Sequence, residues 1–170
     1  MYLNSTPLIY LAKVGLISII EETGDDLLIP GLVFDEVVTV GKQRGDADSF
    51  IIEECIKRGT IKIVDPASKF TGFESEIHAA EMDVMALARE YGCIAIIDDG
   101  IAREIGEMCN VNVHGAFYLI FQAVRRGSLS KQESVEKMGE MIRKGWMERL
   151  TPSGTHSFRM WRVHTIGYPR

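Results

Sequence analysis

The chain has 170 residues, of which 46% are hydrophobic and 25% charged, and its formal net charge is −5. This length is enough for one domain with a full apolar core. The composition excludes a disordered chain, and the negative net charge excludes a protein whose whole surface is basic and binds nucleic acid without specificity. The three cysteines lack zinc-ligand spacing, no apolar run approaches membrane-spanning length and no signal-peptide pattern opens the chain, so we expect a cytoplasmic protein with no membrane partner.

Short apolar runs alternate with helical patterns along the chain. Strands are expected at residues 1–3, 26–30, 61–65, 93–97 and 111–113. Helices are expected at residues 7–14, 17–22, 32–40, 46–57, 74–91, 101–108, 116–125 and 132–144, with a solvated connector at 40–45. This alternation predicts an α/β domain with a mainly parallel sheet.

The first strand ends on a polar corner, Asn4-Ser5-Thr6-Pro7. Thr6 is a favourable N-cap and Pro7 suits the first position of a helix, so the pair predicts a helix start there. Asn4 has no part in that capping pattern, and its role has to come from the rest of the chain.

Two glutamates lie among apolar residues at helical spacing. Glu81 lies four residues after Ile77 and three before Val84, and Glu36 lies within the apolar positions of residues 32–40. A carboxylate that faces a core is costly unless it is paired or bound to a metal. The alternative is that Glu81 lies at the edge of its stripe and accepts a hydrogen bond from a backbone amide.

A third anomaly is the apolar strand that runs directly into Asp98 and Asp99. In open α/β sheets, ligands bind beyond the carboxyl ends of the strands, where Asn4 is also expected. The alternative for the two aspartates is a turn in which one of them caps the next helix. Two inward glutamates and two polar strand ends together favour a site for Mg²⁺ or Mn²⁺.

Four stretches carry a resemblance to a known family: LNSTPLIYLAKVG, IPGLVFDEV, AAEMDVMALAREYGCIAIIDDGIAR and VHGAFYLIFQAVRRG. In this order they resemble the PIN-domain ribonucleases, most of all the small prokaryotic members of unassigned role, over roughly residues 1–127. The resemblance implies a three-layer α/β/α sandwich. It also implies an acidic cleft in which one or two Mg²⁺ or Mn²⁺ ions support hydrolysis of RNA phosphodiester bonds.

The resemblance also assigns residues by position. It implies that Glu36, Glu81 and Asp99 are acidic metal ligands, that Asp98 is the adjacent catalytic acid and that Arg103 lies near the phosphate. The family's first ligand is an aspartate, and this chain has Asn4 there. An asparagine still offers a carbonyl oxygen, but it removes one negative charge, so weaker metal binding is expected.

Three functions stay open from the sequence. The first is a metal-dependent endoribonuclease with Glu36, Glu81, Asp98 and Asp99 as catalytic residues. The second is a catalytically impaired module that binds RNA or protein, and the third is a toxin with a small antitoxin-like partner. Contacts with RNA are expected from Thr6, Arg103, Arg159 and Arg162.

The chain divides into a PIN-like domain at residues 1–150 and a C-terminal tail at residues 151–170. The tail has no acidic residue and combines three arginines with aromatic residues. It suits contacts with single-stranded RNA, or else an added strand or dimer arm. A homodimer is expected, and the stripe formed by Phe117, Ile120, Phe121 and Val124 suits either the core or the dimer interface.

Overall fold

A computed structural model describes residues 1–21 and 26–146 of the chain. Its centre is a five-stranded sheet in the order β3-β2-β1-β4-β5, and every pairing is parallel. The strands are β1 (Tyr2–Leu3), β2 (Leu27–Ile29), β3 (Ile61–Ile63), β4 (Ala95–Ile96) and β5 (Val113–His114). The five strands lie where the apolar runs predict them, and the mainly parallel sheet is confirmed.

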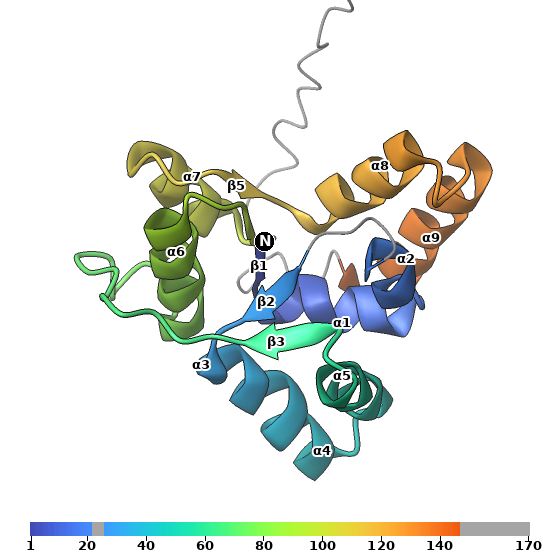
Figure 1. The fold of residues 1–170 in the computed structure, drawn as a ribbon, viewed down its shortest axis with the longest axis horizontal. Helices are drawn as coiled ribbons and strands as arrows, with labels where there is room; N and C mark the ends of the chain where they lie inside the picture. The colour runs from blue at the N-terminus through green and yellow to red at the C-terminus, as the bar shows by residue number, and fades with distance from the viewer. Residues whose placement is uncertain (22–25, 147–170) are drawn as a thin grey trace, which may run out of the picture.

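Helices cover both faces of the sheet, which gives the predicted three-layer α/β/α sandwich. Helices α1, α2, α5, α8 and α9 form one layer, and α6 and α7 cover the other face, on the left in Figure 1. The longer helices are α1 (Ser5–Lys13), α5 (Ala47–Lys57), α6 (Ala79–Tyr91), α7 (Gly100–Met108), α8 (Ala116–Arg126) and α9 (Lys131–Arg143). Shorter ones are α2 (Ile17–Glu21), α3 (Gly31–Phe34) and α4 (Gly41–Arg44). No helix in the described ranges has the length and apolarity to cross a membrane.

The strand order reverses between β1 and β4, and we refer to the carboxyl ends of these two strands as the β1–β4 crevice. The chain moves outward from β1 to β2 and β3, and then returns to place β4 on the other side of β1. In parallel sheets such a reversal leaves a gap at the carboxyl ends, because the two flanking helices lie on opposite faces. The register pairs Leu3 with Ile96, so Asn4 and the residues after Ile96 meet at this point.

The core is built where strand side chains meet the two helix layers. Leu3, Ile29 and Ile96, from three neighbouring strands, have no exposed surface, and neither has Leu87 on α6. Burial of such aliphatic side chains contributes about 1.5–3 kcal/mol each. These residues hold β1 and β4 rigidly in register, and so they fix the positions of the polar residues that follow both strands.

The first helix begins earlier than the capping pattern predicts. Asn4 is the residue before α1, with extended backbone angles, and its carbonyl oxygen accepts a hydrogen bond from the amide of Leu8 at 3.3 Å. Thr6 therefore lies inside the first turn rather than at the N-cap, and its expected capping role is wrong. The Asn4 side chain makes no capping bond, so it is free to point into the crevice.

The segment after β2 differs most from the prediction. Residues 31–44 are continuously helical, with a π-helical stretch at Asp35–Val40, so the connector expected at 40–45 is wrong. A π-helical stretch shifts the helical spacing because each turn holds more residues. Leu32 and Val40 are consequently 45% and 40% exposed, and Glu36 is exposed rather than inward.

Helix α6 begins at Ala79, five residues later than predicted. Ile77 is buried but precedes the helix, in the segment that follows β3. That segment is fastened to the end of α6, because the Glu90 carboxylate accepts the backbone amides of Ala67 and Ser68 at 3.2 and 2.6 Å. The expected tail at residues 151–170 lies outside the described residues, and so do Arg159 and Arg162.

Candidate metal centre

Asn4 opens the site, at the carboxyl end of β1. Its backbone amide donates to the carbonyl oxygen of Ile96 at 3.0 Å, which fastens it to β4. Its side chain is buried, and Nδ2 donates to Glu81 Oε1 at 3.3 Å. The side-chain oxygen Oδ1 is also buried and has no hydrogen-bond partner among the described residues. A buried carbonyl oxygen without a donor is costly, and a cation would satisfy it.

Glu81 lies opposite Asn4 in the first turn of α6, and it is only 7% exposed. Its Oε2 accepts a hydrogen bond from the backbone amide of His78 at 2.9 Å. Glu81 therefore has both the burial that its spacing predicts and the hydrogen bond to a backbone amide that was the alternative explanation. Burial raises the pKa of the Glu81 carboxyl, and the negative charges of Asp99 and Glu36 raise it further. Asp99 and Glu36 therefore lie close enough to Glu81 for their charges to oppose its ionisation.

Asp99 follows β4 and is the N-cap of α7. Its Oδ1 accepts the backbone amide of Ala102 at 2.8 Å, which is the capping role considered from the sequence. The same carboxylate raises the pKa of Glu81 by charge repulsion. Asp99 thus combines a capping oxygen with a negative charge directed at the acidic group.

Glu36 comes to the site from the π-helical stretch, which packs against α1. Ser5 Oγ donates to Glu36 Oε2 at 2.5 Å, so the residue next to Asn4 orients this carboxylate. Nothing in the sequence predicts this contact between Ser5 and Glu36. Ser5 adjoins Asn4 in the chain, but 31 residues separate it from Glu36.

Asp98 is not part of this acidic group, although it precedes Asp99 in the chain. It is 3% exposed, and its two oxygens accept the backbone amide of Ala116 and the indole Nε1–H of Trp146, each at 2.7 Å. Neighbouring residues at a strand end point to opposite sides, which separates the two aspartates. Burial raises the pKa of the Asp98 carboxyl, while these two donors and the charge of Arg103 oppose the rise.

The two described residues expected to contact RNA, Arg103 and Thr6, are both half-buried. Arg103 is half-buried on α7, where its guanidinium lies beside Asp98 and Gly115. Thr6 is half-buried in the first turn of α1, two residues after Asn4.

The donor set fits a hard divalent cation in its chemistry. Asn4, Glu36, Glu81 and Asp99 offer only oxygen atoms, which Mg²⁺ and Mn²⁺ prefer. The unpartnered Oδ1 of Asn4 is the observation in favour of a cation at this position. In the described ranges, however, no three Asp, Glu, His or Cys side chains form a ready-made cage. Asn4, Glu36, Glu81 and Asp99 are the residues that would hold such an ion.

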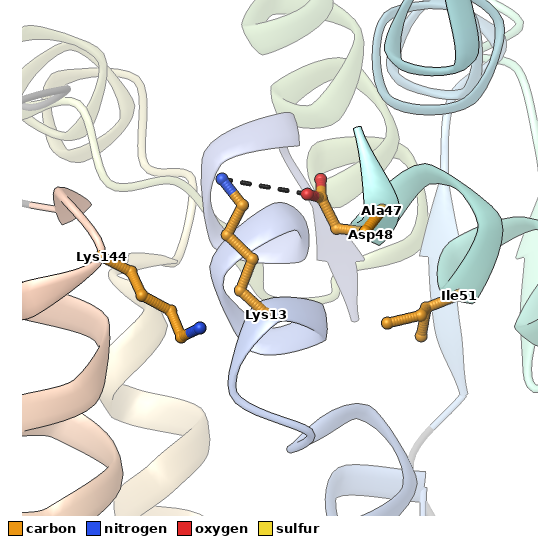
Figure 2. A pocket seen from close by; sticks show the side chains of 5 residues that line it. All are labelled: Lys13, Ala47, Asp48, Ile51 and Lys144. Carbon is orange, nitrogen blue, oxygen red and sulfur yellow. Dashed lines mark ion pairs between the residues drawn. The ribbon is translucent and has the colours of Figure 1, made fainter. Parts of the chain in front are cut away.

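A pocket of about 360 Å³ lies elsewhere, at the far end of α1. Figure 2 shows Lys13 and Asp48 facing one another there, with 3.8 Å between Nζ and Oδ1, and Lys144 on the opposite side. Ala47 and Ile51 complete the lining. One carboxylate beside two ammonium groups does not suit a divalent cation, so the acidic group at the β1–β4 crevice is the candidate site.

Comparison with known families agrees with this architecture. A family model described as a PIN domain matches residues 2–153, nearly the whole chain. The searches of curated proteins and of solved structures found no match. The matched range includes every described element, from β1 to α9. The chain belongs to the PIN-domain family.

Proposed function

We propose that this chain is a divalent-metal-dependent endoribonuclease, with Asn4, Glu36, Glu81 and Asp99 as the ligands of Mg²⁺ or Mn²⁺. Membership of the PIN-domain family supports a nuclease-like role, nucleic-acid binding and use of a divalent metal in general. The observation that carries the assignment to this site is the buried, unpartnered Oδ1 of Asn4 beside the buried Glu81 carboxylate.

The described residues have separate tasks in this proposal. Glu81 and Asp99 supply negative charge, and a backbone amide holds one oxygen of each carboxylate. The other oxygen of Glu81 accepts the Asn4 side-chain amide, so both residues would turn toward the same ion. Ser5 orients Glu36 toward the same group. A bound ion supplies neutralisation of the phosphate charge and acidification of a water molecule. Arg103 and Thr6 are the proposed contacts with the RNA backbone.

The test uses two variants that keep the local hydrogen bonds. Asp99→Asn retains a good N-cap, and Glu81→Gln retains an oxygen that accepts the His78 amide. Both should abolish the thermal stabilisation by Mn²⁺ and the cleavage of a single-stranded RNA, while the protein stays folded. Full Mn²⁺ stabilisation in both variants would contradict the site.

Asn4 favours a second candidate function, a binding module without cleavage. An asparagine at the first ligand position removes one charge from the ion's surroundings, which weakens binding. In that case the chain binds RNA, but Mn²⁺ neither stabilises it nor produces cleavage. Restoring the charge with Asn4→Asp would then restore both properties.

The partner expectations are part of the proposal but rest on the sequence. They comprise a homodimer, a tail at residues 151–170 that either adds a strand or dimer arm or contacts RNA, and, in the case of a toxin, a small antitoxin-like protein. Sedimentation of the purified chain tests the dimer. Removal of residues 151–170 tests the tail, since loss of phosphate contacts flattens the dependence of RNA binding on salt concentration.

A further inference from the structure

A buried cluster joins the last described turn of the chain to Asp98. The Asp98 carboxylate accepts the Ala116 amide on one oxygen and the Trp146 indole N–H on the other, each at 2.7 Å. Trp146 is 3% exposed, and its ring stacks on Phe117 with centroids 4.5 Å apart. The indole is therefore fixed both by its face and by its N–H, and each Asp98 oxygen has a buried donor.

Arg103 lies beside this cluster without joining it. A Cβ at Gly115 would lie 3.0 Å from Asp98 Oδ1 and 3.2 Å from Arg103 Nη1, so the two charged groups flank the same glycine. No ion pair of Arg103 within 4.0 Å of a carboxylate occurs in the described part of the chain. An arginine beside a buried carboxylate is well suited to a bidentate pair. Here the Asp98 carboxylate already accepts hydrogen bonds from Ala116 and Trp146. The N–H groups of the half-buried Arg103 guanidinium are therefore not bound to it.

We propose that Trp146 is a positioning residue that keeps Arg103 available for an RNA phosphate, because its indole N–H occupies the Asp98 carboxylate. The inference rests on the proposed function, since a phosphate has to reach this site. Without the indole N–H, one buried oxygen of Asp98 would lose its donor, which is costly for a carboxylate. Arg103 is the adjacent cation that would satisfy it, and it would then be withdrawn from the phosphate.

The test compares Trp146→Phe with Arg103→Ala in RNA binding. Phenylalanine keeps an aromatic ring on Phe117 but lacks the N–H donor. Binding of a short single-stranded RNA is measured over a range of salt concentrations, with EDTA present so that the RNA stays intact. Trp146→Phe should reduce the slope of log K against log salt by about one, as Arg103→Ala does, and the double variant should show no further loss.

A rescue variant separates positioning from mere packing. In the Trp146→Phe background, Asp98→Asn keeps an acceptor for the Ala116 amide but removes the charge that attracts Arg103. The salt slope should return to the wild-type value. Phe117→Leu, which disturbs the stacking but keeps the indole donor, should leave the slope unchanged. An unaltered slope in Trp146→Phe, or a reduced slope that Asp98→Asn does not restore, would overturn the proposal.

A second measurement needs no RNA. If Trp146→Phe recruits Arg103 to Asp98, then Arg103→Ala should lower the melting temperature more in that background than in the wild-type chain. Equal shifts would overturn the proposal. Absence of RNA binding by the wild-type chain would contradict the proposed function instead, while the melting comparison still tests Trp146. If Trp146→Phe does not fold, the test uses Asp98→Asn alone. This variant should keep the wild-type dependence of RNA binding on salt, because no charge at residue 98 is left to attract Arg103. A smaller salt slope would refute the inference.

Discussion

Asn4 and Glu81 face one another across the β1–β4 crevice, with 3.3 Å between the amide nitrogen and the carboxylate oxygen. The same amide group leaves its buried oxygen without a donor. An aspartate in place of Asn4 would put two carboxylates within hydrogen-bonding distance of one another. Compared with an aspartate, Asn4 therefore stabilises the metal-free site, but it offers a cation one negative charge fewer.

Asn4→Asp should strengthen Mn²⁺ binding by at least tenfold and lower the melting temperature of the metal-free protein. With the ion bound, the added negative charge of the aspartate attracts it and outweighs the repulsion between this aspartate and Glu81. Without the ion, only the repulsion remains. Calorimetric titration and thermal melting measure the two effects. The matched control is Asn112→Asp, the same change at an exposed residue before β5. Equal Mn²⁺ affinities for Asn4→Asp and wild type would place Asn4 outside the metal site.

Glu81→Gln should stabilise the metal-free protein, and the gain should grow as pH rises. Burial and the charges of Asp99 and Glu36 raise the pKa of Glu81 in the folded state. Stability from this group is therefore complete below the unfolded-state pKa and is lost as pH rises through the folded-state value. At pH 7 we expect a rise of a few degrees in melting temperature, as about 1 kcal/mol produces in a domain of this size. Glu76→Gln, at an exposed position, is the control, and a gain independent of pH would argue against the repulsion.

Ser5→Ala should weaken Mn²⁺ binding severalfold with little change in stability. The variant removes the hydroxyl that orients Glu36, while the carboxylate itself is exposed and can take water in its place. Thr39→Ala is the control, because Thr39 makes the same type of bond to the exposed Asp35. Identical Mn²⁺ affinities in both variants would show that the orientation of Glu36 does not matter for binding.

Gly115→Ala should destabilise the protein by about 1–3 kcal/mol, as overpacking of a close-packed site does. The added Cβ would lie 3.0 Å from the buried Asp98 carboxylate and 3.2 Å from Arg103. Gly100→Ala, where nothing lies within 4 Å, should be neutral or slightly stabilising, since alanine favours helix. Chemical denaturation of both variants gives the comparison. An unchanged free energy of unfolding in Gly115→Ala would mean that the side chains of Arg103 and Asp98 move aside for the added methyl group at little cost.

The sequence predicts the sheet and Glu81 well, because both depend on local apolar spacing. Glu81 is inward as its position between Ile77 and Val84 predicts, although Ile77 lies before the helix. Glu36 was expected to face inward from the same kind of spacing, and it does not. The π-helical stretch changes the number of residues in a turn, and so it changes the direction in which Glu36 points. No residue type in its sequence, DEVVTV, predicts a π-helix.

The surroundings of Asp98 could not be predicted from the sequence. Two adjacent aspartates at a strand end indicate a site, but not that they point to different partners. The partner of Asp98 is Trp146, 48 residues later and beyond the stretch that carries the family resemblance. Such a contact depends on how α8 and α9 return to the sheet, which tertiary packing decides and local pattern does not.

The strand order also has a consequence for the order of synthesis. Asn4, Glu81 and Asp99 come together only when β4 has inserted beside β1, and the chain up to the end of β3 at Ile63 contains only the first of these three ligands. Domains fold as their segments emerge from the ribosome, N-terminal parts first. A nascent chain of this protein thus has no complete acidic site while β1, β2 and β3 alone are available. If the site cuts RNA, a nascent chain cannot cut the messenger from which it is being made until β4 and Asp99 have left the ribosome.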